Sequence, residues 1–216
     1  GYTVVDAATV VATHVSELLR RNSHELLGRR EVQELLDIFG KTHSSLVEEL
    51  IPTLLPLGEV IKVLRNLLAE GVSVRDMRTI LETLADHSGQ TKDPEILTEL
   101  VRARMAKFLT GRVRGEDGRV HALVLDPQLE HSLRESLQQG GALGFDSAAV
   151  PKLLGALEQA MGNIGNLAAL PTLLVGPDLR PHMAAFVGRH MPGLAVYSYR
   201  EIEPNTPIQT LAVVGS

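Results

Sequence analysis

The side chains best able to do chemistry in this chain are its eight histidines and its 26 aspartates and glutamates, which could bind a metal ion. A helical zinc site needs two histidines four residues apart, because that spacing turns both imidazoles to one face of the helix. Neither His14 with Glu17 nor His24 with Glu25 belongs to such a pattern. We therefore predict no metal site and interpret the histidines as surface or partly buried residues.

Two glycine-rich segments, residues 140–144 and 162–166, could cradle a phosphate group. Each follows a predicted helix rather than a strand, and neither contains the Lys-Ser or Lys-Thr pair of a nucleotide-binding loop. We interpret both as loops or helix ends. Asp126 and Asp178 lie where a predicted strand meets a helix, at the edge where α/β proteins bind ligands. A phosphate would need bare N–H groups there, so helix capping is the better interpretation.

Catalysis by a nucleophile or by paired carboxylates has no support in the sequence. The chain has no cysteine, and no serine lies in the Gly-x-Ser-x-Gly turn of hydrolases. Glu48 and Glu49 are consecutive, so on a helix they lie on adjacent faces and are interpreted as solvated surface. We predict that the protein is not an enzyme and needs no cofactor. An α/β ligand-binding or enzymatic domain, built around Asp126 and Asp178, is the alternative from another functional class.

The composition also disfavours nucleic acid as a partner. Of the 216 residues 44% are hydrophobic and 22% charged, as in ordinary globular proteins, and the net charge is −5. Residues 57–70 and 73–86 outline a helix-turn-helix, with Arg75 and Arg78 on the second helix. Three acidic residues of that same helix oppose binding to phosphates: Asp76, Glu82 and Asp86. We interpret the two segments as helices that pack together.

The elements that must position these residues are mainly helices up to about residue 107. Helical spacing of apolar residues predicts helices over residues 9–22, 23–40 and 57–70, a short helix from Ser44 or Ser45, and helices that begin near Ser73 and Pro94. Gly40 and Gly71 are predicted to end helices. Ser73 is predicted to cap the helix after it, with Asp76 three residues further on.

Beyond residue 108, short apolar runs alternate with helical segments. The predicted strands are residues 120–125, 171–175, 194–199 and 208–214, and the predicted helices between them are residues 127–139, 147–161 and 178–189. Strands that alternate with helices favour parallel pairing. The predicted fold is therefore mixed α+β and α/β, with a helical subdomain followed by a small α/β subdomain that contains a mostly parallel four-stranded sheet.

The start of the chain predicts a fragment. The chain begins at Gly1 without an initiator methionine, directly in a strand-like run over residues 2–5, so we expect a longer parent protein. No apolar run approaches the roughly 20 residues that cross a bilayer. The absence of cysteine suits a reducing cytoplasm. We expect this fragment to be soluble and cytosolic.

Three segments of the sequence resemble a known family. They are GYTVVDAATVVATHVSELLRR at the start, VSVRDMRTILETLA followed by TKDP at residues 91–94, and LRPHMAAFVGRHMPGLAVYSYREI. They are similar to the FHIPEP family, the large export-gate subunits shared by flagellar and virulence type III secretion systems. The first of these segments favours the flagellar branch, and the virulence branch is the alternative.

The resemblance implies a function that the residues alone do not reveal. Members of the family are integral inner-membrane proteins through their N-terminal half, and their cytosolic half forms a nonameric ring at the cytoplasmic face of that membrane. The ring receives export chaperone–substrate complexes and the associated ATPase complex. By this resemblance, residues 1–22 close the first cytosolic subdomain, residues 23–107 form the helical third and residues 108–216 the α/β fourth.

The resemblance also implies a binding site at the beginning of the chain. Family members bind chaperone–substrate complexes in a hydrophobic dimple between their first two subdomains. The matching positions here are Val5, Val10 and Thr13. Without the resemblance, Val5 and Val10 would be interpreted as core residues of a strand and a helix. Because the rest of the dimple lies upstream, we expect the fragment alone to bind chaperones weakly and to be a monomer or to associate weakly.

Overall fold

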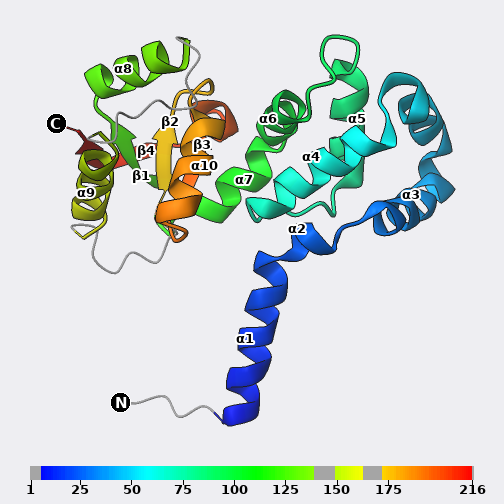
Figure 1. Ribbon diagram of the computed structural model, residues 1–216, viewed down its shortest axis with the longest axis horizontal. Coiled ribbons are helices and arrows are strands. Elements are labelled where there is room, and N and C mark those ends of the chain that lie inside the picture. Colours follow the sequence, from blue (N-terminus) through cyan, green and yellow to red (C-terminus); the bar gives the residue numbers. More distant parts are fainter. Residues whose placement is uncertain (1–5, 139–148, 163–171, 216) are drawn as a thin grey trace. The chain divides into compact units, whose positions relative to one another are not determined.

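A computed structural model describes residues 6–138, 149–162 and 172–215 of the chain. The chain divides into two compact units, Gly1–Arg104 and Met105–Ser216 (Figure 1). The described elements of the first unit are α1 (Ala7–Arg21), α2 (Ser23–Leu26), α3 (Arg29–Glu49), the π-helical turn η1 (Leu50–Leu54), α4 (Leu57–Ala69), α5 (Met77–His87) and α6 (Pro94–Arg104).

The first unit is held together by the apolar faces of α3 to α6. Helix α4 contacts α6, and α5 contacts both α3 and α6. Leucine, valine and isoleucine recur at helical spacing in these segments, so each helix buries one face. The fully buried aliphatic side chains of α4, α5 and α6 are Val60, Val63, Leu64, Leu67, Ile80, Leu81, Leu84, Leu97 and Val101.

The two glycines predicted to end helices behave differently. Gly71 has a φ of 68°, the left-handed conformation that ends a helix, and α4 stops at Ala69 before it. Gly40 is not among the glycines with positive φ, and α3 continues through it, so that prediction is wrong. The helical geometry breaks instead at His43, whose φ is −138° and ψ is 46°. The imidazole of His43 stacks on Phe39 at 4.4 Å between ring centres.

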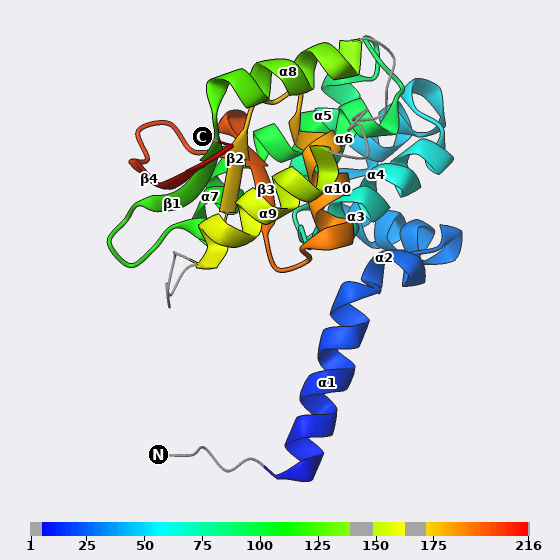
Figure 2. The ribbon, with the colours of Figure 1, turned by 60° about the vertical axis from the view of Figure 1, so that its left-hand side comes forward.

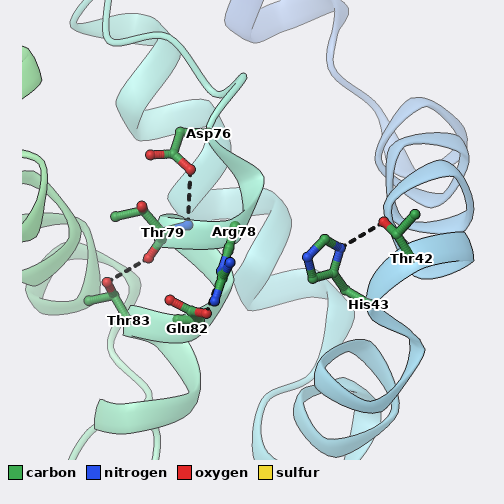
Figure 3. A network of polar contacts seen from close by, with 7 residues as sticks. All are labelled: Thr42, His43, Asp76, Arg78, Thr79, Glu82 and Thr83. Carbon is green, nitrogen blue, oxygen red and sulfur yellow. Dashed lines mark hydrogen bonds and ion pairs between the residues drawn. The ribbon is translucent and has the colours of Figure 1, made fainter.

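The N-cap of α5 is Asp76 rather than Ser73. The Oδ1 of Asp76 accepts a hydrogen bond from the backbone N–H of Thr79 at 3.1 Å (Figure 3). Ser73 lies outside the helix, and its hydroxyl oxygen accepts from the backbone N–H of Arg75 at 3.3 Å. Asp76 accepts from one of the free N–H groups of the first turn because it directly precedes Met77, where the helix begins.

Replacing Asp76 by alanine should therefore lower the free energy of unfolding by about 1 kcal/mol, the usual cost of a lost N-cap. Replacing Ser73 by alanine should change it by less than about 0.5 kcal/mol, as for other surface positions. Urea unfolding of the two variants measures both values. Equal losses would show that Ser73 contributes to the helix start as much as Asp76 does.

The second unit contains a wholly parallel sheet in the described residues. Its elements are α7 (Ala106–Val113), β1 (Val120–Leu125), α8 (Pro127–Gln138), α9 (Ala149–Gly162), β2 (Thr172–Val175), α10 (Arg180–His190), β3 (Ala195–Ser198), the 3-10 turn η2 (Tyr199–Glu201) and β4 (Ile208–Val214). The strand order is β3-β2-β1-β4, and every pairing is parallel. The predicted fold class is confirmed: a helical unit precedes an α/β unit with four strands.

The sheet packs its apolar side chains against helices of the same unit. Leu123, Leu173 and Val175 from the strands join Leu157 of α9 and Met183 of α10 in one buried cluster. Burial differs between the strands: all four residues of β2 are buried, as expected for an inner strand of a parallel sheet, whereas the first three residues of β4 are exposed. Of the glycine-rich stretches at 140–144 and 162–166, for which loops or helix ends are predicted, only Gly162 is described, and α9 ends at it.

Candidate docking site on the first helix

Helix α1 begins at a well-formed cap. The carboxylate of Asp6 accepts hydrogen bonds from the backbone N–H of Thr9 at 2.9 Å and from its hydroxyl at 2.7 Å. The bond from the Thr9 hydroxyl, followed by that from the backbone, lowers the pKa of Asp6 below its usual value. The cap's contribution is therefore present above the ordinary aspartate pKa and is lost as the pH falls through the lowered one.

Four of the large apolar side chains of α1 form a stripe that is exposed in the described structure. Successive residues of a helix are turned by about 100°, so the four residues of the stripe fall within about a third of the helix circumference. They are Val11, Val15, Leu18 and Leu19, with exposed fractions of 61%, 47%, 46% and 54%. A helix with such a stripe needs an apolar surface to cover it.

The predicted site residues lie on a different face of the same helix. Val10 and Thr13 are three residues apart, so they are neighbours on the helix surface, and Thr13 lies roughly opposite the stripe. Val10 is 55% exposed, and Thr13 is exposed as well. The hydroxyl of Thr13 donates to the carbonyl oxygen of Thr9 at 2.8 Å. Val5, the third predicted residue, lies outside the described residues.

Val10 and Thr13 offer exposed side chains on this helix and no reactive group. Because α1 has two separate faces, the stripe can be covered while Val10 and Thr13 stay accessible. In this chain Val10 is therefore not a core residue. Sequence spacing identified the apolar positions of the helix, but it did not indicate that they are exposed in the described structure, because exposure depends on what packs beside the helix.

At the alternative site, the carboxyl ends of the strands, the charged side chains form hydrogen bonds and ion pairs with one another. The Oε1 of Glu130 accepts from the backbone N–H of Gly176 at 2.9 Å and from Arg134 at 2.7 Å. Arg134 also donates to Asp178 at 2.7 Å. Asp178 is therefore an ion-pair partner, and the prediction that it caps α10 is wrong, since α10 begins without a side-chain cap. The i, i+4 spacing of Glu130 and Arg134 was the signal for this cluster.

The other groups at this edge also have structural roles. Asp126 caps α8, as predicted, by accepting from the backbone N–H of Gln128 at 2.9 Å. Burial, and secondarily the charge of Glu130, raises the pKa of the Tyr199 phenol. In the described part of the chain no three histidine or acidic side chains are grouped as a metal site would require. Nor is any helix there long and apolar enough to cross a membrane.

The fold is that of cytosolic domains from type III secretion systems. The structure of the Chlamydia pneumoniae CdsV protein superimposes with a TM-score of 0.85 at 28% identity, over 96% of this chain and 60% of that one. The nonameric EscV cytosolic domain from the type III secretion system gives a TM-score of 0.81 at 29% identity, over 95% and 61%.

Sequence comparison finds relatives of higher identity than these structures. The chain is 41% identical over 215 residues to the flagellar biosynthesis protein FlhA of Escherichia coli K12, and 34% identical over 217 residues to that of Bacillus subtilis. It spans only 31% and 32% of the length of these two relatives. The FHIPEP family pattern matches residues 1–207. The chain belongs to the FHIPEP family.

Proposed function

We propose that the chain is part of a flagellar type III export gate and serves it as a cytosolic docking platform. The observation that carries this proposal is the difference between the two sets of similarities. Identity to flagellar FlhA proteins is 41% for E. coli and 34% for B. subtilis. Identity to CdsV and EscV is only 28% and 29%, although the fold is shared. The flagellar branch is therefore favoured over the virulence branch.

The proposed assembly is a homo-oligomeric ring at the cytoplasmic face of the inner membrane. The EscV cytosolic domain and EPEC SctV-C are both nonameric, and CdsV forms a complex with CdsO. The parent of this chain would form a similar ring and would receive export chaperone–substrate complexes and the ATPase complex. Its membrane segments would belong to the part of the parent protein outside these 216 residues.

The proposed subdomains follow the resemblance to the family. Residues 1–22 would complete the first cytosolic subdomain, whose apolar surface would cover the stripe of α1. Residues 23–107 would form the helical third subdomain, and residues 108–216 the α/β fourth. The protein would act by docking its partners and would catalyse no reaction itself, because the charges at the strand ends are engaged in caps and ion pairs.

The proposed contact surface is the face of α1 that carries Val10 and Thr13, together with Val5. Two features support it. The face is separate from the apolar stripe, so the stripe can be buried without hiding it. Val10 and Thr13 are themselves uncharged, as residues at the centre of a protein interface usually are.

Replacing Thr13 by lysine should weaken the binding of a flagellar chaperone–substrate complex at least about tenfold, because an interface would have to desolvate the added ammonium group. Isothermal titration calorimetry on the complete cytosolic part of the parent protein measures this. Thr13→Ser, which keeps the hydroxyl, and Ser45→Lys, which adds the same charge at an exposed position of α3, should both bind as the unmodified protein does.

Two results would count against the proposal. Equal binding by Thr13→Lys and the unmodified protein would remove α1 from the contact surface. Failure of the unmodified protein to bind any flagellar chaperone–substrate complex would remove the docking function itself.

A further inference from the structure

Strand β4 forms one edge of the sheet in the second unit. It pairs with β1 on one side, and the described residues place no strand on its other side (Figure 2). The backbone of a strand carries hydrogen-bonding groups on both sides, so an edge strand offers an unused row of donors and acceptors.

In the first half of β4, alternate residues direct their backbone N–H and C=O groups to the open side of the strand. The N–H of Val120 donates to the carbonyl oxygen of Pro207 at 2.9 Å, which fixes the register at the beginning of the pair. In a parallel ladder, residues of a strand turn alternately toward and away from the neighbouring strand. Gln209 therefore faces β1 with its backbone groups, and Ile208 and Thr210 face the open side.

The usual protections against strand addition are absent from this half. Protein edges are commonly guarded by charged side chains, prolines or bulges. The strand Ile208–Val214 contains no charged residue and no proline. Its register shift lies after Thr210, because Ala122 pairs with Thr210 whereas Leu123 pairs with Ala212. Ile208 is 41% exposed, and Gln209 and Thr210 are exposed as well.

A positive charge reaches the first half of β4 from the β1 side, since Arg119 directly precedes β1. The guanidinium of Arg119 donates to the side-chain oxygen of Gln209 at 3.5 Å. The nearby Asp117 carboxylate is engaged by His121 at 3.0 Å and by the backbone N–H of Arg119. An added strand with an acidic side chain next to Arg119 would therefore gain a charge-assisted contact.

The same charge disfavours a second copy of this chain as the occupant. Two copies would pair their β4 edges antiparallel about a two-fold axis near Gln209, because a symmetric interface uses the same surface twice. The two Arg119 side chains would then lie over the same joined sheet, each reaching the Gln209 of its own β4. Like charges opposite one another destabilise a strand pair.

We propose that the edge at residues 208–210 accepts an extended segment of an exported polypeptide as a fifth strand, with an acidic side chain beside Arg119. The origin of the segment rests on the proposed function; the strand addition does not. Main-chain hydrogen bonds supply most of the affinity in such a contact, so many sequences are accepted. This tolerance suits an export gate that must handle different cargo proteins.

Fluorescence anisotropy with the 216-residue chain tests the proposal. The probe is a labelled peptide of about ten residues that alternates threonine and valine and carries two glutamates. Thr210→Pro removes an outward N–H and should weaken binding at least about tenfold, whereas Thr210→Val keeps it and should bind equally. Arg119→Gln should abolish the preference for this peptide over one with lysines in place of glutamates.

A second measurement keeps the test valid if Thr210→Pro does not fold. In the unmodified protein, bound peptide should slow amide hydrogen exchange at Ile208 and Thr210 and leave Gln209 nearly unchanged, because Gln209 already faces β1. Absence of peptide binding, or exchange slowed equally at all three amides, would overturn the proposal. So would self-association in sedimentation velocity that Thr210→Val retains and Thr210→Pro abolishes, since the occupant would then be a second copy.

This test is independent of the one on α1. Peptide binding at β4, with no binding of any flagellar chaperone–substrate complex to the unmodified cytosolic part, would retain the strand addition and reject the proposed docking function. Chaperone binding at Thr13 without peptide binding at β4 would retain the proposed docking function and reject the strand addition.

Discussion

Replacing Leu64 by alanine is expected to lower the free energy of unfolding of the first unit by about 2–5 kcal/mol. Leu64 lies in the middle of α4, and its side chain is fully buried. Deleting its outer carbons removes apolar area from the core and leaves a cavity, and the helices around it can close such a cavity only in part. A loss of this size is a large share of the stability of an ordinary domain.

Two probes separate the units in this experiment. Most of the described helices belong to the first unit, so far-ultraviolet circular dichroism during urea unfolding reports mainly on it. Two of the three tyrosines, Tyr197 and Tyr199, lie in the second unit, so tyrosine fluorescence reports mainly on that unit. Leu64→Ala should move the circular dichroism transition to lower urea concentration. A loss of unfolding free energy smaller than about 0.5 kcal/mol would mean that α4 is not tightly packed.

The matched control is Leu26→Ala, which deletes the same atoms from α2. Leu26 is 61% exposed, so little apolar area is lost and no cavity forms. Its effect should stay within about 0.5 kcal/mol. If the two variants lose similar stability, burial of leucine would not be what holds the first unit together.

The alternation of strands and helices could be predicted from the sequence because it is a local property. Apolar runs at residues 120–125 and 208–214 correspond to β1 and β4, with the same bounds. Helix ends were less predictable. Gly40 and Gly71 are the same residue type, but only Gly71 adopts the left-handed conformation. That difference depends on the packing of the following segment, which no local pattern contains.

Tertiary contacts also determined which of two similarly placed aspartates caps its helix. Asp126 and Asp178 both stand between a strand and a helix, but only Asp126 caps its helix. Asp178 is drawn to Arg134, a residue 44 positions away in the sequence. A charged partner that distant cannot be seen in local spacing, so the prediction for Asp178 was wrong for a physical reason.

The candidate site could be predicted only through resemblance to the family. Residue types and spacing indicated a helix through Val10 and Thr13, and α1 confirms it. They did not mark these two positions as a contact surface, because a valine and a threonine carry no recognisable chemistry. The open edge at residues 208–210 was likewise not evident before the strand order was known, since an edge strand and a central strand share the same apolar pattern.

The second large effect is expected at a charge pair in the first unit, where removing the acid should cost more than removing the base. Arg102 of α6 is 2% exposed, and its guanidinium lies 3.1 Å from the carboxylate of Glu70, which is 29% exposed. Glu70→Ala takes a counter-charge from a buried cation and should lower the free energy of unfolding by about 3 kcal/mol. Arg102→Met removes the buried charge, fills a similar volume and returns Glu70 to water, so its cost should stay within about 1 kcal/mol.

The double variant Glu70→Ala with Arg102→Met distinguishes this explanation from a simple loss of contacts. If the cost of Glu70→Ala comes from removing a counter-charge of the buried Arg102, adding Arg102→Met should restore about 2 kcal/mol of it, because the double variant carries no buried cation at this position. If the two costs merely add, the carboxylate stabilises α4 and α6 by means other than its charge. Urea unfolding followed by circular dichroism, with Arg78→Met as a control at the solvent-exposed pair with Glu82, decides between the two.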